Sequence, residues 1–137
     1  MTKKIVSACL AGFQCRFDCA HKEREEIRAM VEKGEAIAVC PEQMGGLPTP
    51  RTPAEQIGNK IISKTGTDVT AEYELGAHQA LKMAELTGAT EAYLKSRSPM
   101  CGSGQIYDGS FSGKLVEGDG VFTKLLKSRN IKVIAVD

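Results

Sequence analysis

Four short apolar runs divide the chain, and each has the length and composition of a β-strand. They are KIVSA at 4–8, EAIAV at 35–39, EAYL at 91–94 and KVIAV at 132–136. Runs of four or five apolar residues are typical of strands rather than helices. The pattern therefore predicts four strands spread along the whole sequence.

Between these runs, apolar positions recur at the spacing of an α-helix. In the segment 22–33, Ile27, Met30 and Val31 fall on one face, and Gly34 follows as a residue that favours a helix end. The predicted helices cover 22–33, 71–87 and 120–129.

Strands that alternate with helices predict right-handed crossovers and a parallel sheet with helices on both faces. We therefore expect a three-layer, Rossmann-like α/β fold. The chain has 137 residues, 42% of them hydrophobic and 26% charged, which suits a single domain over 1–137. The stretches NKIISK at 59–64 and GQIYDGSFSG at 104–113 are expected to add short strands or a hairpin, the latter with a turn at Asp108-Gly109.

The charge balance excludes some classes of partner. The net charge is +1, which gives no electrostatic reason to expect nucleic acid or an anionic membrane as the main partner. The start, MTKKIVSACLAG, faintly resembles a bacterial lipoprotein signal, but its apolar run is too short for a signal peptide or a membrane span. We expect a first strand there and a cytoplasmic protein. The number of chains that assemble stays open.

The positions of the cysteines indicate a candidate functional site. Cysteines stand at positions 9, 15, 19, 40 and 101. In a reducing cytoplasm such a set is more often catalytic or metal-binding than a disulfide framework. Cys9 follows the first predicted strand, Cys40 the second, and Cys101 lies in the loop after the third. The carboxyl ends of parallel strands share one edge of the sheet, so these three thiols are expected to converge there.

Three converging thiols fit several kinds of chemistry. They suit zinc with one open position, three irons of a 4Fe–4S cluster with the fourth iron free, or a redox relay. The P-C-x-x-C motif that zinc deaminases need beside an H-x-E is absent from the sequence. His21 and His78 are expected near a helix start and on a helix surface, not as ligands. Cys9 and Arg16 have six residues between them, which weakens a phosphatase-type loop.

Several motifs together resemble those of the iron–sulfur-dependent thiouracil desulfidases. They are SACLAG at 7–12, CPEQMGGLPTPR at 40–51, AEQIG at 54–58, GTDVT at 66–70, GA at 76–77, KSRSPMCG at 95–102 and IYDGSFSG at 106–113. The resemblance covers nearly the whole chain. It implies a 4Fe–4S cluster held by Cys9, Cys40 and Cys101, with one iron not ligated by the protein. It also implies Glu42 and Ser98 as the catalytic pair and a small thiolated pyrimidine as the substrate.

Two departures from the family pattern lead to further expectations. The chain has QCRFDCA where the family usually has a V-R-Y-D-G pattern. We expect the additional Cys15 and Cys19 to be unligated thiols near the site; the alternative is that one of them is a fourth cluster ligand, which would close the open iron. The chain has SPMCG where the family has SPSCG, so Met100 is expected to alter a wall of the site. Arg51 and Arg97 are expected to be structural or surface groups rather than substrate contacts; the alternative is that either contacts the phosphate of a nucleotide substrate.

The resulting hypothesis is hydrolytic removal of sulfur from 2- or 4-thiouracil, or from 4-thiouridine or its monophosphate, with release of sulfide. Glu42 would activate water and Ser98 would handle a proton. Two alternatives stay open: a non-catalytic iron–sulfur or metal carrier or sensor, and a metal-free cysteine redox enzyme. The ring position of the sulfur and the need for a sugar or phosphate also stay open.

Overall fold

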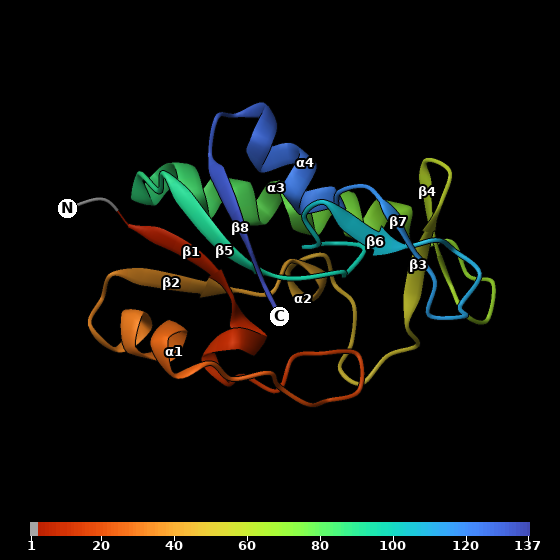
Figure 1. The fold of residues 1–137 in the computed structure, drawn as a ribbon, viewed down its shortest axis with the longest axis horizontal. Helices are drawn as coiled ribbons and strands as arrows, with labels where there is room; N and C mark the ends of the chain where they lie inside the picture. Colours follow the sequence, from red (N-terminus) through yellow and green to blue (C-terminus); the bar gives the residue numbers. More distant parts are fainter. Residues whose placement is uncertain (1–2) are drawn as a thin grey trace.

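A parallel sheet forms the centre of the protein, as the sequence predicts (Figure 1). The computed structural model describes residues 3–137, and its central sheet has four strands in the order β2-β1-β5-β8. All three strand pairs are parallel. The strands are β1 (Lys4–Ser7), β2 (Ala36–Val39), β5 (Glu91–Lys95) and β8 (Lys132–Val136). Each end lies within one residue of the predicted bounds.

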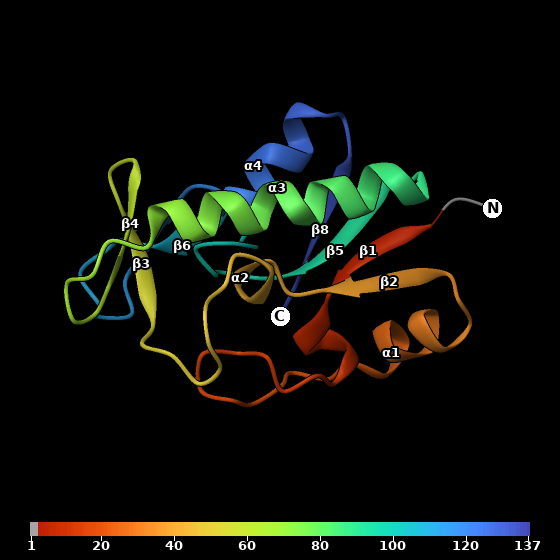
Figure 2. The same cartoon turned by 180° about the vertical axis from the view of Figure 1, so that it is seen from behind.

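Helices cover both faces of this sheet. The helix α1 (Glu25–Glu32) lies on one face, and α3 (Thr70–Thr87) and α4 (Val121–Ser128) lie on the other, where Figure 2 shows α3 crossing the sheet. Successive side chains of β1 point to opposite faces of the sheet, because side chains alternate along a strand. Ile5 packs in the apolar cluster that contains α3 and α4, whereas Val6 packs with Ile27 of α1. The predicted three-layer α/β fold is confirmed.

The helix α1 begins three residues later than the predicted range 22–33. The backbone N–H groups of Lys22 and Arg24 donate instead to the carbonyls of Cys9 and Leu10, at 2.9 and 2.8 Å. Those bonds keep the segment extended until Glu25. The helices α3 and α4 agree with prediction to within one residue at each end. Among residues 3–137, no helix is long and apolar enough to cross a membrane.

Two hairpins flank the carboxyl end of the sheet. The first joins β3 (Ala54–Ile57) to β4 (Lys60–Ser63), and the second joins β6 (Gln105–Tyr107) to β7 (Leu115–Glu117). The predicted tight turn at Asp108-Gly109 is wrong, because the connection runs over residues 108–114. This longer loop is held by the carboxylate of Glu55, which accepts hydrogen bonds from the backbone of Gly109 and Phe111 at 2.9 and 3.1 Å.

A short helix, α2 (Pro41–Met44), follows β2 directly and packs against α3 with backbone on backbone. A Cβ on Gly76 of α3 would overlap the carbonyl oxygen of Pro41, and a Cβ on Gly45 would overlap the carbonyl oxygen of Glu72. Glycine at both positions is what allows the two helices to approach so closely. The contact fixes the position of the segment that carries Cys40.

We expect Gly76→Ala to destabilise the protein. Inside a helix this change normally stabilises by roughly 0.5–1 kcal/mol. Here the added methyl meets the Pro41 backbone, so the free energy of unfolding should fall by about 1–3 kcal/mol, as in other overpacked cores. Denaturant unfolding measures the effect. Lys82→Ala, at an exposed position of the same helix, serves as the control and should change stability little. A stabilised Gly76→Ala variant would contradict the close packing.

Candidate active site

Three cysteines from distant parts of the sequence line one pocket. Cys9 lies in a short 3₁₀-helix, η1 (Ala8–Ala11), directly after β1. Cys40 lies between β2 and α2, and Cys101 lies in the turn that follows β5. The pocket has a volume of about 430 Å³ and opens at the edge where the parallel strands end. The expected convergence of the three strand ends is therefore present in the structure.

The two candidate catalytic residues line the same pocket. Glu42 lies on α2, two residues after Cys40. The hydroxyl oxygen of Ser98 accepts hydrogen bonds from the backbone N–H groups of Met100 and Cys101 at 3.2 and 2.7 Å. Ser98 therefore shapes the turn that presents Cys101, and its hydroxyl still carries a proton of its own to donate.

The turn around Cys101 is anchored on α4. The carbonyl of Cys101 accepts a hydrogen bond from the buried hydroxyl of Thr123 at 2.9 Å. A Cβ on Gly120 would overlap the backbone of Met100, so the start of α4 lies directly against this turn. These contacts with α4 fix the turn from which Cys101 faces the pocket.

Met100 is not a wall of the site, and this expectation is wrong. Its side chain is fully buried and packs in the apolar cluster formed by the sheet, α3 and α4. It is not among the residues that line the pocket. The turn directs Cys101 into the pocket and Met100 into the core, so the residue that differs from the family pattern is a packing residue.

The two additional cysteines occupy different environments. Cys15 is buried and lines the pocket, and its carbonyl accepts a hydrogen bond from the Cys40 thiol at 3.7 Å. Cys19 is exposed and is not among the pocket residues. None of the cysteines forms a disulfide. Only Cys15 thus lies beside the three converging thiols.

The pocket affects the acidity of these thiols unequally. Burial, assisted by the negative charge of Glu42, raises the pKa of Cys9 to about 11. Burial also raises the pKa of Cys101 well above its usual value. A hydrogen bond with the Cys15 thiol lowers the pKa of Cys40, in spite of burial. A metal would have to displace protons from Cys9 and Cys101 when it binds.

The rates at which the thiols of the metal-free protein are alkylated should follow the order of their pKa values. The thiolate is the reactive form, so at pH 8 iodoacetamide should modify Cys40 faster than Cys9. Because the raised pKa of Cys9 is about 11, its rate should rise about tenfold per pH unit between pH 8 and 10. Peptide mass spectrometry at several pH values measures each site, and exposed Cys19 in the same sample gives a reference rate. Equal rates at Cys9 and Cys40 would contradict the assigned environments.

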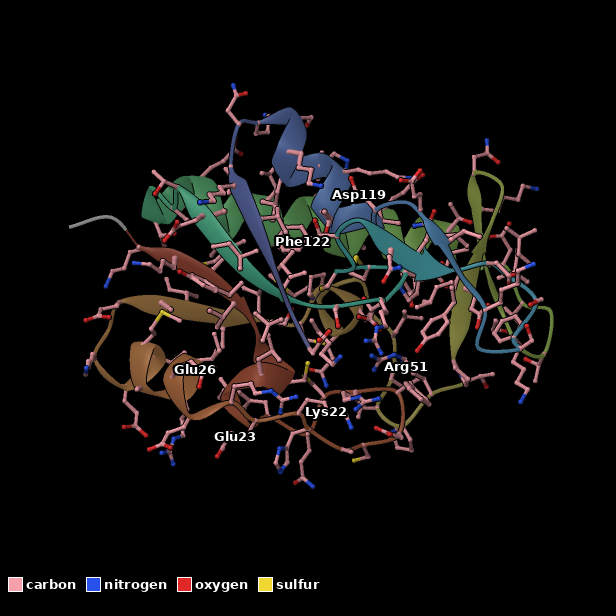
Figure 3. The ribbon with its side chains drawn as sticks, in the orientation of Figure 1. Lys22, Glu23, Glu26, Arg51, Asp119 and Phe122 are labelled. Atoms are coloured by element: carbon pink, nitrogen blue, oxygen red, sulfur yellow. The ribbon has the colours of Figure 1, made fainter. Side chains whose placement is uncertain are left out.

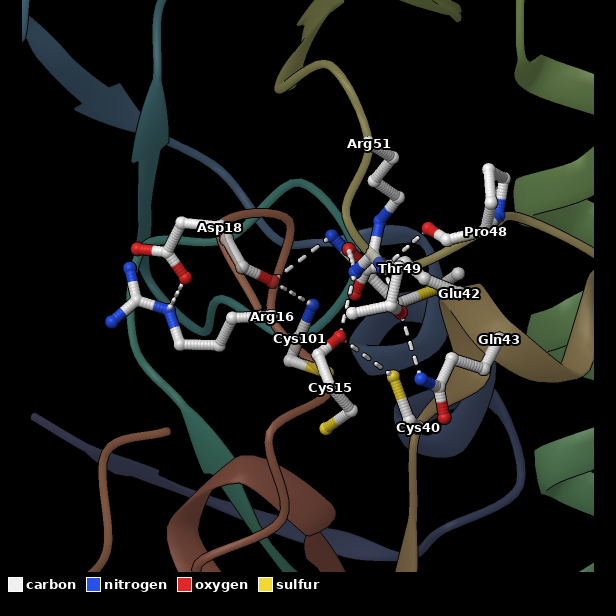
Figure 4. A network of polar contacts seen from close by, with 12 residues as sticks. Cys15, Arg16, Asp18, Cys40, Glu42, Gln43, Pro48, Thr49, Arg51 and Cys101 are labelled. Atoms are coloured by element: carbon white, nitrogen blue, oxygen red, sulfur yellow. Dashed lines mark hydrogen bonds and ion pairs between the residues drawn. The ribbon is translucent and has the colours of Figure 1, made fainter. Parts of the chain in front are cut away.

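Arg51 is a residue of the site that was not predicted from the sequence. Its side chain is only 7% exposed, and Nη2 lies 2.8 Å from Oε2 of Glu42. The same nitrogen donates to the Cys15 carbonyl at 3.1 Å, while Nη1 donates to the Pro48 carbonyl and the Thr49 hydroxyl, both at 3.1 Å (Figure 4). Of the two roles expected for Arg51, structural or surface, the structure shows the structural one, because its side chain pairs with Glu42. The only signal in the sequence was its position at the end of the CPEQMGGLPTPR motif.

Other charged and polar groups complete the pocket. Arg97 lines it, but its side chain is 46% exposed and forms a 3.7 Å ion pair with Asp137. Tyr73 of α3 is buried, and burial together with the charge of Glu42 raises its pKa, so the phenol stays neutral.

Lys95 also lines the pocket, and burial lowers its pKa. The aromatic wall comes from loops and a hairpin: Phe17, Tyr107 and Phe111.

The donor set suits an iron–sulfur cluster. Such clusters are held by cysteine thiolates, each bound to a different iron, and here three thiols line one pocket. Within residues 3–137, no group of three or more His, Cys, Asp or Glu side chains is arranged to hold a single metal ion. His21 and His78 are exposed and are not among the residues that line the pocket.

Comparisons with known proteins agree with this chemistry. Residues 5–137 match the family model described as 2-thiouracil desulfurase. A Bacillus subtilis (strain 168) protein, YbbK, described as uncharacterized, is 43% identical over 141 residues, which cover 96% of this chain and 93% of that protein. A solved structure described as the 4Fe-4S-dependent thiouracil desulfidase TudS is 44% identical, with a TM-score of 0.94, and the match covers 98% of this chain and 91% of that one.

Proposed function

The chain belongs to the 2-thiouracil desulfurase family, and we propose that it removes sulfur hydrolytically from a thiolated pyrimidine and releases sulfide. The observation that carries the proposal is the composition of the pocket: three thiols, a carboxylate and a hydroxyl line the same cavity. A carrier needs only the thiols. The carboxylate of Glu42 adds a group that accepts a proton from water.

We propose Cys9, Cys40 and Cys101 as the residues that hold a 4Fe–4S cluster, with one iron not ligated by the protein. Two observations support this cofactor: the three thiols share one pocket, and the similar solved structure is described as 4Fe-4S-dependent. A bound cluster with such an iron would supply a Lewis acid for the sulfur of the thiocarbonyl.

The protein's own groups would carry the proton transfers. Water attacks the ring carbon that bears sulfur, and Glu42 takes one of its protons. The bond between carbon and sulfur then breaks. Ser98 donates its proton to the departing sulfur and regains one from the hydroxyl that water has added to the ring carbon, and Glu42 returns its proton to the sulfur. The balance is thiocarbonyl plus water giving carbonyl plus hydrogen sulfide, with no oxidant or reductant. Phe17 and Phe111 offer aromatic surface for a planar ring, and a pocket of about 430 Å³ is within the usual range for small-molecule sites.

One experiment tests the proposal directly. Protein prepared without oxygen is assayed for iron and sulfide content, and then for sulfide release from 2-thiouracil, 4-thiouracil, 4-thiouridine and its monophosphate. We expect about four irons per chain, the number in a 4Fe–4S cluster, and sulfide release from at least one of these substrates. An intact cluster with no sulfide released from any of them would favour a cluster carrier or sensor instead.

A further inference from the structure

Arg51 connects three segments that surround the pocket. Its backbone N–H donates to the carbonyl of Phe17 at 2.8 Å. Its side chain contacts Cys15 in the same loop, Pro48 in the loop after α2, and Glu42 on α2 itself. Figure 3 shows Arg51 beyond the carboxyl ends of β1 and β2, where these segments meet.

The guanidinium is held in place without help from Glu42. Two of its acceptors are backbone carbonyls from different loops, those of Cys15 and Pro48, and a third is the hydroxyl of Thr49. A planar guanidinium bonded on both terminal nitrogens keeps a fixed orientation. Glu42 is therefore bound to a fixed group and not to a mobile surface charge (Figure 4).

The carboxylate needs such a partner because of where it lies. The side chain of Glu42 is 17% exposed, and several thiols share its pocket. A mostly buried carboxylate is costly unless it is paired and hydrogen-bonded. The ion pair takes up Oε2, and the second oxygen, Oε1, is then the one that would accept a proton from water.

We propose that Arg51 is a positioning residue that holds the Glu42 carboxylate in its reactive orientation. This inference rests on the proposed function, since it concerns the group that activates water. Arg51 acts through Glu42 and does not itself contact the reacting atoms. Lysine keeps the positive charge but lacks the planar fork, so it should replace arginine only in part.

Enzyme kinetics with the loaded protein test this assignment. Arg51→Met should lower kcat by about 100-fold, the loss expected when a reacting group is misplaced by about an ångström, while KM changes little. Arg51→Lys should recover part of that loss and serves as the folded variant if Arg51→Met is unstable. Iron content is measured for each variant. The control is Arg129→Met, because Arg129 pairs with Glu85 at 3.3 Å on the exposed surface, and its kcat should not change.

A double-mutant cycle separates positioning from a general structural role. If Arg51 acts through Glu42, adding Arg51→Met to Glu42→Gln should lower kcat little further. Additive losses would overturn the proposal. A crystal structure of Arg51→Met provides a test that does not depend on activity: we expect the Glu42 carboxylate to turn away, and an unchanged carboxylate would also overturn the proposal. Failure of the wild type to release sulfide would count against the proposed function alone.

Discussion

Replacing Cys101 with serine should remove both the cluster and the activity while the fold survives. The Cys101 thiol is buried in a turn fixed by Ser98 and Thr123, and serine fits the same space. A hydroxyl is a poor ligand for iron compared with the soft thiolate. Turnover should fall by more than the roughly 10- to 100-fold that loss of an outer-shell partner alone costs at a metal site.

The measurement combines iron content, visible absorbance, sulfide release and thermal unfolding of the Cys101→Ser protein. Cys19→Ser is the control, because Cys19 is exposed and outside the pocket. Cys15→Ser is more informative, since Cys15 lies beside Cys40. We expect both controls to retain iron. Loss of iron in Cys15→Ser, with Cys101→Ser still loaded, would move the ligand assignment to Cys15.

Much of the fold could be predicted because short apolar runs leave few alternatives. The predicted strand ending before Cys9 and the one ending before Cys40 are adjacent parallel strands, and their shared carboxyl edge brings the two thiols together. The placement of Cys101 follows from the same rule, since β5 is the other neighbour of β1. Convergence of these residues is a property of strand order and needs no knowledge of the loops.

The contacts and side-chain directions of the loop residues could not be predicted in this way. Arg51 and Glu42 are nine residues apart, and no periodic pattern shows that a loop folds back to join them. Met100 illustrates the opposite error. A residue next to a candidate ligand looked like a site residue, but a turn directs neighbouring side chains in different directions, and Met100 enters the core.

Two of the motifs that carry the family resemblance have a structural role. Glu55, in AEQIG, accepts hydrogen bonds from the backbone of the distant IYDGSFSG loop. Gln56 donates to the carbonyls of Pro99 and Asp119, at 3.2 and 3.0 Å. The first hairpin therefore holds the loop that contains Phe111 and the turn that leads to Cys101. Such long-range pairings become visible only when the chain is folded.

Glu42→Gln should separate chemistry from cluster binding. Glutamine has the same size, and its amide oxygen can accept the hydrogen bond that Arg51 now donates at 2.8 Å. The change therefore keeps the local geometry and removes only the carboxylate that we propose as the proton acceptor. General-base assistance typically contributes about 10²- to 10⁴-fold, so sulfide release should fall by that factor while iron content and absorbance stay unchanged.

The matched control is Glu26→Gln, the same chemical change at an exposed position of α1 (Figure 3). It should leave turnover unchanged, because no charge at that site contacts the pocket residues. If Glu42→Gln lost its iron, Glu42 would be a ligand or a structural support of the cluster. If it kept both the cluster and full turnover, another group would have to take the proton from water. Tyr73, whose neutral phenol lies in the same pocket, is a proton donor and does not meet that need, whereas Lys95 lines the pocket with a pKa lowered by burial and would be the next group to test.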